Sequence, residues 1–92
     1  MRINVINKDA NNFKLQITDL DLPNKIMVNY INRSKALLDN NYGKGSILFK
    51  FEIAPNQKDI TVMIPYGYYN SLKQINNLLT AAYDSLENNY EA

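Results

Sequence analysis

Two short segments near the N-terminus, residues 2–7 and 13–19, alternate between hydrophobic and polar positions. A period of two residues is typical of β-strands that bury one face. The apolar positions that define this face are Ile3, Val5, Phe13, Leu15 and Ile17. Because the polar, turn-forming sequence KDANN lies between the two segments, the pattern predicts a β-hairpin with its other face in water.

The next segment changes to helical spacing. Pro23 suits the first position of a helix, and hydrophobic residues then recur every three or four positions as far as Leu38. Gly43 and Gly45 follow, and the backbone freedom of glycine allows a helix to end and the chain to turn. We therefore expect a first helix over about residues 23–40.

The second half of the chain repeats this alternation. Residues 46–54 and 60–64 form two period-two segments around the turn-forming sequence PNQKD. Pro65 ends the second segment, because proline cannot donate a hydrogen bond to a β-ladder. In the first of these segments the expected buried face carries Ile47, Phe49, Phe51 and Ile53, and the outer face carries Leu48, Lys50 and Glu52.

A second helix is predicted at the C-terminal end. Ser71, with Gln74 three residues later, forms a capping-box pattern ahead of a narrow apolar stripe that ends at Tyr90. At a spacing of 48 residues, LDNNY at 38–42 falls on LENNY at 86–90, which suggests an internal duplication of a ββα unit. The hairpins need a one-residue shift to align, and asparagine-rich chains produce such matches easily, so the duplication stays open.

The order of the predicted elements, ββαββα, favours an α+β fold. A four-stranded antiparallel sheet would carry both helices on its apolar face. A chain of 92 residues is close to the size at which one hydrophobic core suffices, so we expect a single domain over residues 1–92. The two hairpins can meet in more than one way, so the strand order stays open.

Composition removes several classes of function. The chain has no cysteine and no histidine, which excludes disulfides, thiolate and histidine metal sites, cysteine nucleophiles and serine-histidine triads. We therefore expect no catalytic residues, no bound metal and no cofactor. The net charge of +1 does not by itself select a partner. Apolar runs are too short for a signal peptide or a membrane span, so we expect a cytoplasmic protein without a membrane partner.

Asp19 and Asp21 are the acids for which we consider chemistry, because they flank the end of the second predicted strand and are placed to meet a hard cation. A role as helix N-cap or first-turn charge is the simpler interpretation, since both precede Pro23. An enzyme would need a pocket that brings both carboxylates together with other polar groups.

The sequence IPYGYYN, residues 64–70, places Tyr66, Tyr68 and Tyr69 within four positions. Tyrosine combines an apolar body, a polar tip and few rotatable bonds, so a tyrosine cluster suits a protein–protein contact. The structural alternative is that Tyr66 and Tyr69 cover the open end of the sheet and only Tyr68 stays exposed.

Our first hypothesis is a non-catalytic domain that binds another protein, self-association included, through the tyrosine loop and the outer face of the second hairpin. The chain is rich in Asn, Lys, Ile and Tyr, as AT-rich coding sequence produces. An inhibitor or adaptor encoded by a phage or mobile element fits this bias. The candidate contact residues are Leu48, Lys50, Met63, Tyr66, Tyr68 and Tyr69.

The alternative hypothesis is a small nucleic-acid-binding module that uses the outer side of the first helix. Asparagine and arginine can hydrogen-bond to base edges, and lysine neutralises phosphate. The candidate residues are Lys25, Asn29, Asn32 and Arg33. A solvated helix face explains the same pattern without nucleic acid.

Overall fold

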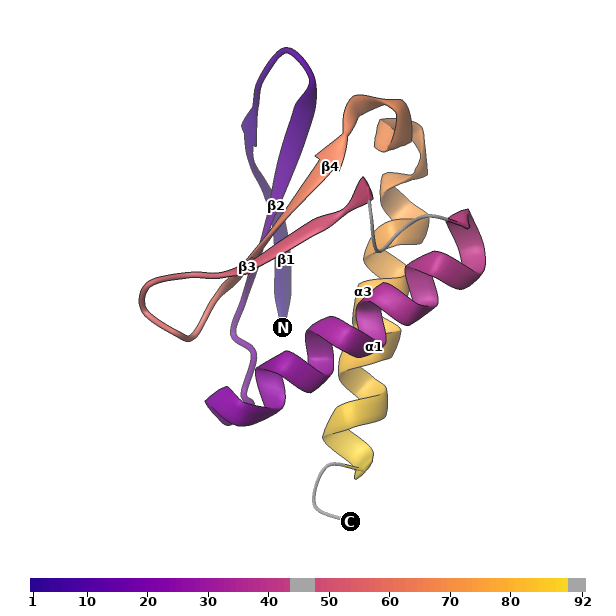
Figure 1. Cartoon of the computed structure of the whole chain (residues 1–92). Helices are drawn as coiled ribbons and strands as arrows, with labels where there is room; N and C mark the ends of the chain where they lie inside the picture. Colours follow the sequence, from indigo (N-terminus) through magenta and orange to yellow (C-terminus); the bar gives the residue numbers. More distant parts are fainter. Residues whose placement is uncertain (44–47, 90–92) are drawn as a thin grey trace.

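Two long helices pack on one face of a four-stranded antiparallel sheet (Figure 1). The computed structural model describes residues 1–43 and 48–89. The element order is ββαββα, with a 3-10 helix directly before the last α-helix, so the predicted α+β fold is confirmed. The elements are β1 (Arg2–Lys8), β2 (Asn12–Thr18), α1 (Asn24–Tyr42), β3 (Lys50–Ile53), β4 (Ile60–Pro65), η1 (Tyr66–Ser71) and α3 (Leu72–Asn89).

Some element boundaries differ from the sequence prediction. α1 begins at Asn24, with Pro23 at its N-cap, and continues to Tyr42. β3 begins only at Lys50, and residues 46–47 of the longer predicted strand lie outside the described residues. α3 begins at Leu72, directly after Ser71, as the capping-box pattern predicts, although Ser71 itself belongs to η1. Tyr90, the last residue of the predicted apolar stripe, also lies outside the described residues.

The strand order is β1-β2-β4-β3, which the sequence left open. The second strand of each hairpin therefore lies at the centre of the sheet, and the two central strands pair antiparallel. Leu15 lies opposite Val62 in this pairing, and both side chains are fully buried under the helices. Because the central strands have a paired neighbour on each side, their alternation of buried and polar positions is the most regular in the sheet.

The ββα unit occurs twice with the same spacing. β1, β2 and α1 begin at residues 2, 12 and 24, and β3, β4 and α3 begin at residues 50, 60 and 72, each 48 positions later. The central strands keep the predicted one-residue shift, since Phe13 of β2 and Ile60 of β4 begin the buried series. Three buried positions of α1 match buried positions of α3 at the same spacing, namely Met27 with Ile75, Ser34 with Ala82, and Leu38 with Leu86.

Tyr30 joins the two helices inside the core. Its ring is fully buried, and its hydroxyl donates a hydrogen bond to the Leu79 carbonyl of α3 at 3.0 Å. The Tyr83 ring of α3 meets it edge-on, with the ring centroids 6.5 Å apart. Burial raises the pKa of Tyr30, because the phenolate would lose its hydration. This polar contact fixes how α1 and α3 cross on the sheet.

α1 ends at Tyr42, two residues beyond its predicted end, and the predicted glycine stop follows directly. Gly43 has a φ of 74°, in the left-handed region that glycine adopts without steric cost. Its N–H donates to the Asp39 carbonyl at 2.8 Å. Gly45, the second glycine of the predicted stop, lies outside the described residues.

Candidate functional site

The three tyrosines of the loop separate into two groups. Residues 66–71 form the 3-10 helix η1, in which residues three positions apart lie on the same side. Tyr66 and Tyr69 therefore share one side of η1, and Tyr68 points to the other. The three tyrosines therefore do not form the single contact surface that their spacing in the sequence suggested.

Tyr68 belongs to a cluster of three aromatic rings. Its ring meets Phe49 edge-on at 5.0 Å between centroids and Tyr42 edge-on at 5.5 Å. Tyr42 and Phe49 also meet each other, at 5.8 Å. The cluster connects the end of α1, the residue before β3 and η1, and Tyr68 is only partly exposed. The expectation that Tyr68 alone stays exposed is therefore wrong.

Tyr66 and Tyr69 cover the end of the sheet, as the structural alternative expects. Their ring centroids lie 5.9 Å and 5.2 Å from that of the fully buried Phe13. The Tyr66 N–H also donates to the Asn11 carbonyl at 3.1 Å, which extends the pairing of β2 and β4 by one bond. Tyr69 is 37% exposed to solvent, which makes it the most exposed tyrosine of the loop.

Leu48 does not lie on the outer face of the second hairpin, where the alternation placed it. The side chain is partly buried and packs against the core. Because β3 begins at Lys50, the two-residue period does not reach back to Leu48. Leu48 and Tyr68 therefore belong to the core side, and the six predicted contact residues do not form one surface.

Met63 and Lys50 do lie on the outer face, the side of the sheet opposite the helices. Met63 stands between the buried Val62 and Ile64 on β4, so its side chain points away from the core. Lys50 pairs with Met63 across β3 and β4. On the other flank, Lys14 of β2 pairs with the same residue. A methionine on the outer face thus lies between two lysines.

These side chains surround a small hollow of about 100 Å³. Pockets for small-molecule ligands typically measure about 300–1,000 Å³, so this hollow suits a single side chain better than a small molecule. Neither Lys14 nor Lys50 forms an ion pair within the described part of the chain. The residues that line the hollow are Lys14, Lys50, Phe51, Glu52, Thr61 and Met63.

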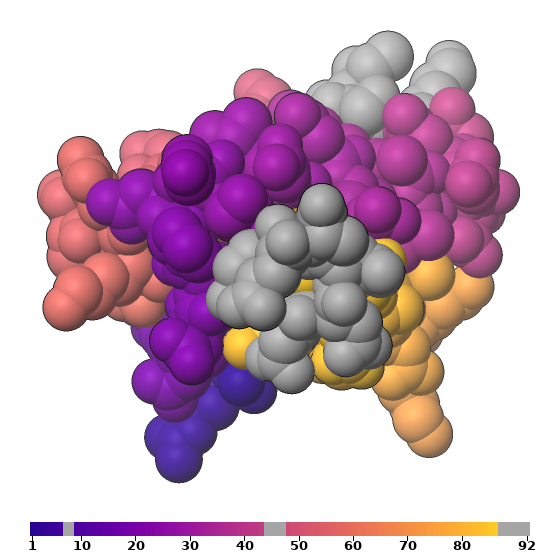
Figure 2. Space-filling model, turned by 90° about the horizontal axis from the view of Figure 1, so that it is seen from below, coloured from indigo at the N-terminus to yellow at the C-terminus, as the bar shows by residue number. Residues whose placement is uncertain are grey.

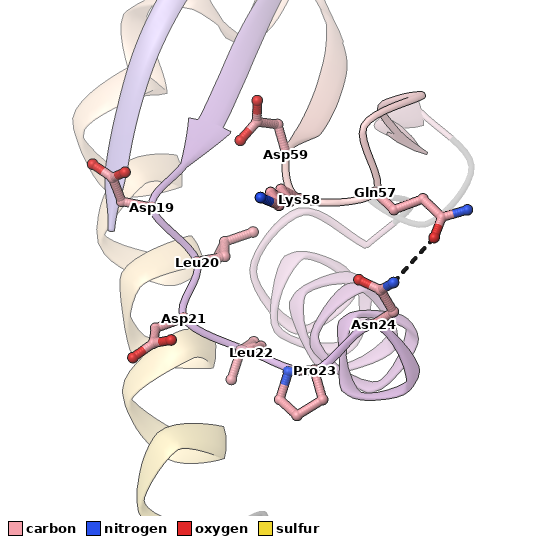
Figure 3. Close-up of a pocket in the computed structure, with 9 residues that line it drawn as sticks. All are labelled: Asp19, Leu20, Asp21, Leu22, Pro23, Asn24, Gln57, Lys58 and Asp59. Atoms are coloured by element: carbon pink, nitrogen blue, oxygen red, sulfur yellow. Dashed lines mark hydrogen bonds between the residues drawn. The ribbon is translucent and has the colours of Figure 1, made fainter.

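A larger cleft of about 660 Å³ lies between the start of α1 and the β3–β4 turn (Figure 3). Asn24 donates a side-chain hydrogen bond to Gln57 across this cleft at 3.0 Å. Leu20 is almost fully buried beneath it, so the cleft combines an apolar floor with a polar rim. Its lining residues are Asp19, Leu20, Asp21, Leu22, Pro23, Asn24, Gln57, Lys58 and Asp59.

Asp19 and Asp21 both line this cleft. An enzyme would also need their carboxylates to lie close together. Figure 3 shows their carboxylates, and that of Asp59, apart from one another around the opening. Asp19 lies 3.6 Å from the Arg2 guanidinium, and both side chains are largely exposed. Within residues 1–43 and 48–89, no group of three acidic side chains is placed to hold a metal ion. The three carboxylates are therefore separate charges on the rim of the cleft.

The predicted capping role of Asp19 and Asp21 is wrong. Pro23 occupies the N-cap position of α1, and no side-chain hydrogen bond caps this end of the helix. The first turn also contains no acidic residue. Asp19 instead adopts a φ of 57° where the chain leaves β2, so it turns the backbone before the helix starts.

The nucleic-acid candidates on α1 do share an exposed face. Lys25, Asn29, Asn32 and Arg33 are all exposed. The last three line a shallow hollow together with Leu86 of α3. Figure 2 shows α1 running across the molecular surface in this view, beside the coloured part of α3.

Comparison of the chain with protein-family models, curated proteins and solved structures finds no match. The described helices include none that is both long enough and apolar enough to cross a membrane.

Proposed function

We propose that the protein is a non-catalytic domain that binds another protein through the outer face of its sheet. The observation that carries this proposal is the position of Met63 between Lys14 and Lys50, beside a hollow the size of one side chain. This proposal keeps two of the residues selected from the sequence and adds Lys14 from the neighbouring hairpin.

The chemistry of this face suits protein contact. Methionine is flexible and polarisable, so it adapts to the shape of a partner. Lysine stems add apolar area around it while their charged ends stay hydrated. A small apolar centre inside a polar rim is the common arrangement of protein-binding surfaces. Such a domain acts by occupying a partner's surface, as an inhibitor or adaptor of phage or mobile-element origin would.

Substituting Met63→Asp tests the site, because a carboxylate placed in the hollow opposes burial under a partner. Val28→Asp is the matched control, since Val28 is an exposed apolar residue on α1 and gains the same charge. Tagged full-length variants are used to capture proteins from native cell lysate, and thermal melting checks that each remains folded. We expect Met63→Asp to lose the captured partner and Val28→Asp to retain it. Equal capture by a folded Met63→Asp variant would exclude this face.

Nucleic-acid binding by α1 is the second candidate function, because Asn29, Asn32 and Arg33 line one shallow hollow. A Lys25→Gln, Arg33→Gln variant would then bind oligonucleotides more weakly than the wild type, with a smaller dependence on salt. Oligonucleotide binding that is unchanged in this variant, or indifferent to salt, would end the second candidate.

A further inference from the structure

The charges of the outer face are arranged in rows across the strands. Lys14, Met63 and Lys50 form one row through β2, β4 and β3. The next row along contains Thr61 opposite Glu52, the acid of this hollow. The hollow thus has two lysines and one glutamate, and the two lysines are the groups that flank its apolar centre.

The two lysines outnumber the one acid of the hollow, and neither forms an ion pair in the described part of the chain. Asp9, in the β1–β2 turn, is attracted to Lys14, but its pKa is lowered mainly by the N–H groups of Asn11 and Asn12. Lys14 is the smallest of these influences on Asp9. The lysine ammonium groups are therefore available to external carboxylates.

Acidic and basic groups lie together beyond the other end of β2. Asp19, Asp21 and Asp59 line the cleft there with Lys58, and Asp19 lies 3.6 Å from the Arg2 guanidinium. Lys14 lies five positions before Asp19, which corresponds to roughly 17 Å along an extended strand. The charge that a partner meets at the hollow is therefore set by Lys14, Lys50 and Glu52 themselves.

We infer that the partner presents an acidic surface, with carboxylates on both sides of an apolar side chain that enters the hollow beside Met63. This inference rests on the proposed function and specifies its partner. Lys14 and Lys50 lie on strands separated only by β4, so their backbones are roughly 10 Å apart. The partner's carboxylates are therefore spaced by a similar distance, with the apolar group between them.

Two charge changes and one charge-conserving control test the sign of the partner's charge. In quantitative capture from native cell lysate, the Lys14→Gln, Lys50→Gln variant should retain at least about fivefold less partner than the wild type. Glu52→Gln should retain about twofold more, because it removes a repulsive carboxylate from the hollow. Lys14→Arg with Lys50→Arg keeps the charge and should retain wild-type capture. Both differences should shrink as NaCl rises from about 50 to about 300 mM.

The outcomes separate the inference from the proposed function. If Met63→Asp abolishes capture while the lysine and Glu52 changes have no effect or the opposite sign, the face binds protein but the partner is not acidic. If a folded Met63→Asp variant captures normally, or the wild type captures nothing specific, the proposed function fails and the inference fails with it. Thermal melting of each variant shows that altered capture does not come from unfolding.

Discussion

The two faces of the sheet are made by alternate residues of the same strands, yet they differ sharply. On the helix side, the central strands bury every apolar residue, and on the outer side Lys14, Gln16, Thr61 and Met63 stay partly exposed. The sequence itself separates the two faces, because the inward positions of the central strands are all apolar and the outward positions are mostly polar, and the helices cover only the apolar face. The fully buried residues are Phe13, Leu15, Ile17, Ile60, Val62 and Ile64. The fold is therefore stabilised mainly through the face under the helices, and the outer face lies outside this core.

The largest loss of stability is expected from a substitution on the buried face of the sheet. Leu15→Ala should lower the free energy of unfolding by about 2–5 kcal/mol, because the side chain is fully buried and its loss leaves a cavity. Its neighbour Gln16 faces outward, so Gln16→Ala should change stability by less than about 0.5 kcal/mol. Chemical denaturation of both variants measures the difference. Similar losses would contradict the assignment of the two faces.

A smaller loss of stability is expected from substitutions in the tyrosine loop, residues 64–70. Tyr68→Ala should cost about 1 kcal/mol more than Tyr69→Ala, because the Tyr68 ring is more buried and joins the end of α1 to the residue before β3. Tyr69 also contacts two rings, Phe13 and Tyr66, but keeps more exposure. Denaturation midpoints of the two single variants test this order. A larger cost at Tyr69 would show that the end of the sheet depends on Tyr69 instead.

The β3–β4 turn should give a smaller effect at the edge of the cleft. Gln57 has a φ of 59°, which is unfavourable for a residue with a Cβ atom. Gln57→Gly and Gln57→Ala both remove the hydrogen bond from Asn24, but only glycine relieves the backbone. We expect the glycine variant to be more stable than the alanine variant by about 1 kcal/mol in thermal or chemical denaturation. Equal stabilities would mean that the turn relaxes at no cost.

The smallest effect concerns pH and the β1–β2 turn. The N–H groups of Asn11 and Asn12 hold the pKa of Asp9 below its ordinary value of 3.8. Because the folded-state pKa is lower than the unfolded one, this carboxylate stabilises the hairpin above pH 3.8 and loses that effect as pH falls through its folded-state pKa. An NMR titration should give a midpoint below 3.8, and Asp9→Ala should reduce the acid dependence of melting. A midpoint at or above 3.8 would contradict the contact.

The sequence predicted the candidate surface only in part. Alternation placed Lys50 and Met63 on the outer face, and the structure places them there as direct neighbours. Lys14 was missed as a site residue, although its position between Phe13 and Leu15 already assigned it to the outer side of its strand. Its contact with the hollow depends on the pairing of β2 with β4, which joins residues far apart in the chain.

Leu48 shows the limit of the same pattern. An alternating sequence continues through it, but a strand needs a partner, and β4 pairs with β3 only from Lys50 onwards. Tyr68 shows a second limit, because spacing along the chain does not reveal that η1 turns with a three-residue period. At both residues the pattern is present in the sequence, but contacts with distant segments decide where the side chain points.

The sequence alone determined the type and order of the four strands and two α-helices, because hydrophobic periodicity is a local property that each segment carries by itself. It did not reveal the 3-10 helix η1. The absence of cysteine and histidine also shows that this sequence offers no disulfide, no cysteine nucleophile and no histidine ligand. Only the tertiary structure decided that β2 and β4 meet at the centre, that Tyr68 packs inward, and that Lys14 stands beside Met63. These features depend on contacts between segments distant in the chain, whose energies no single segment contains.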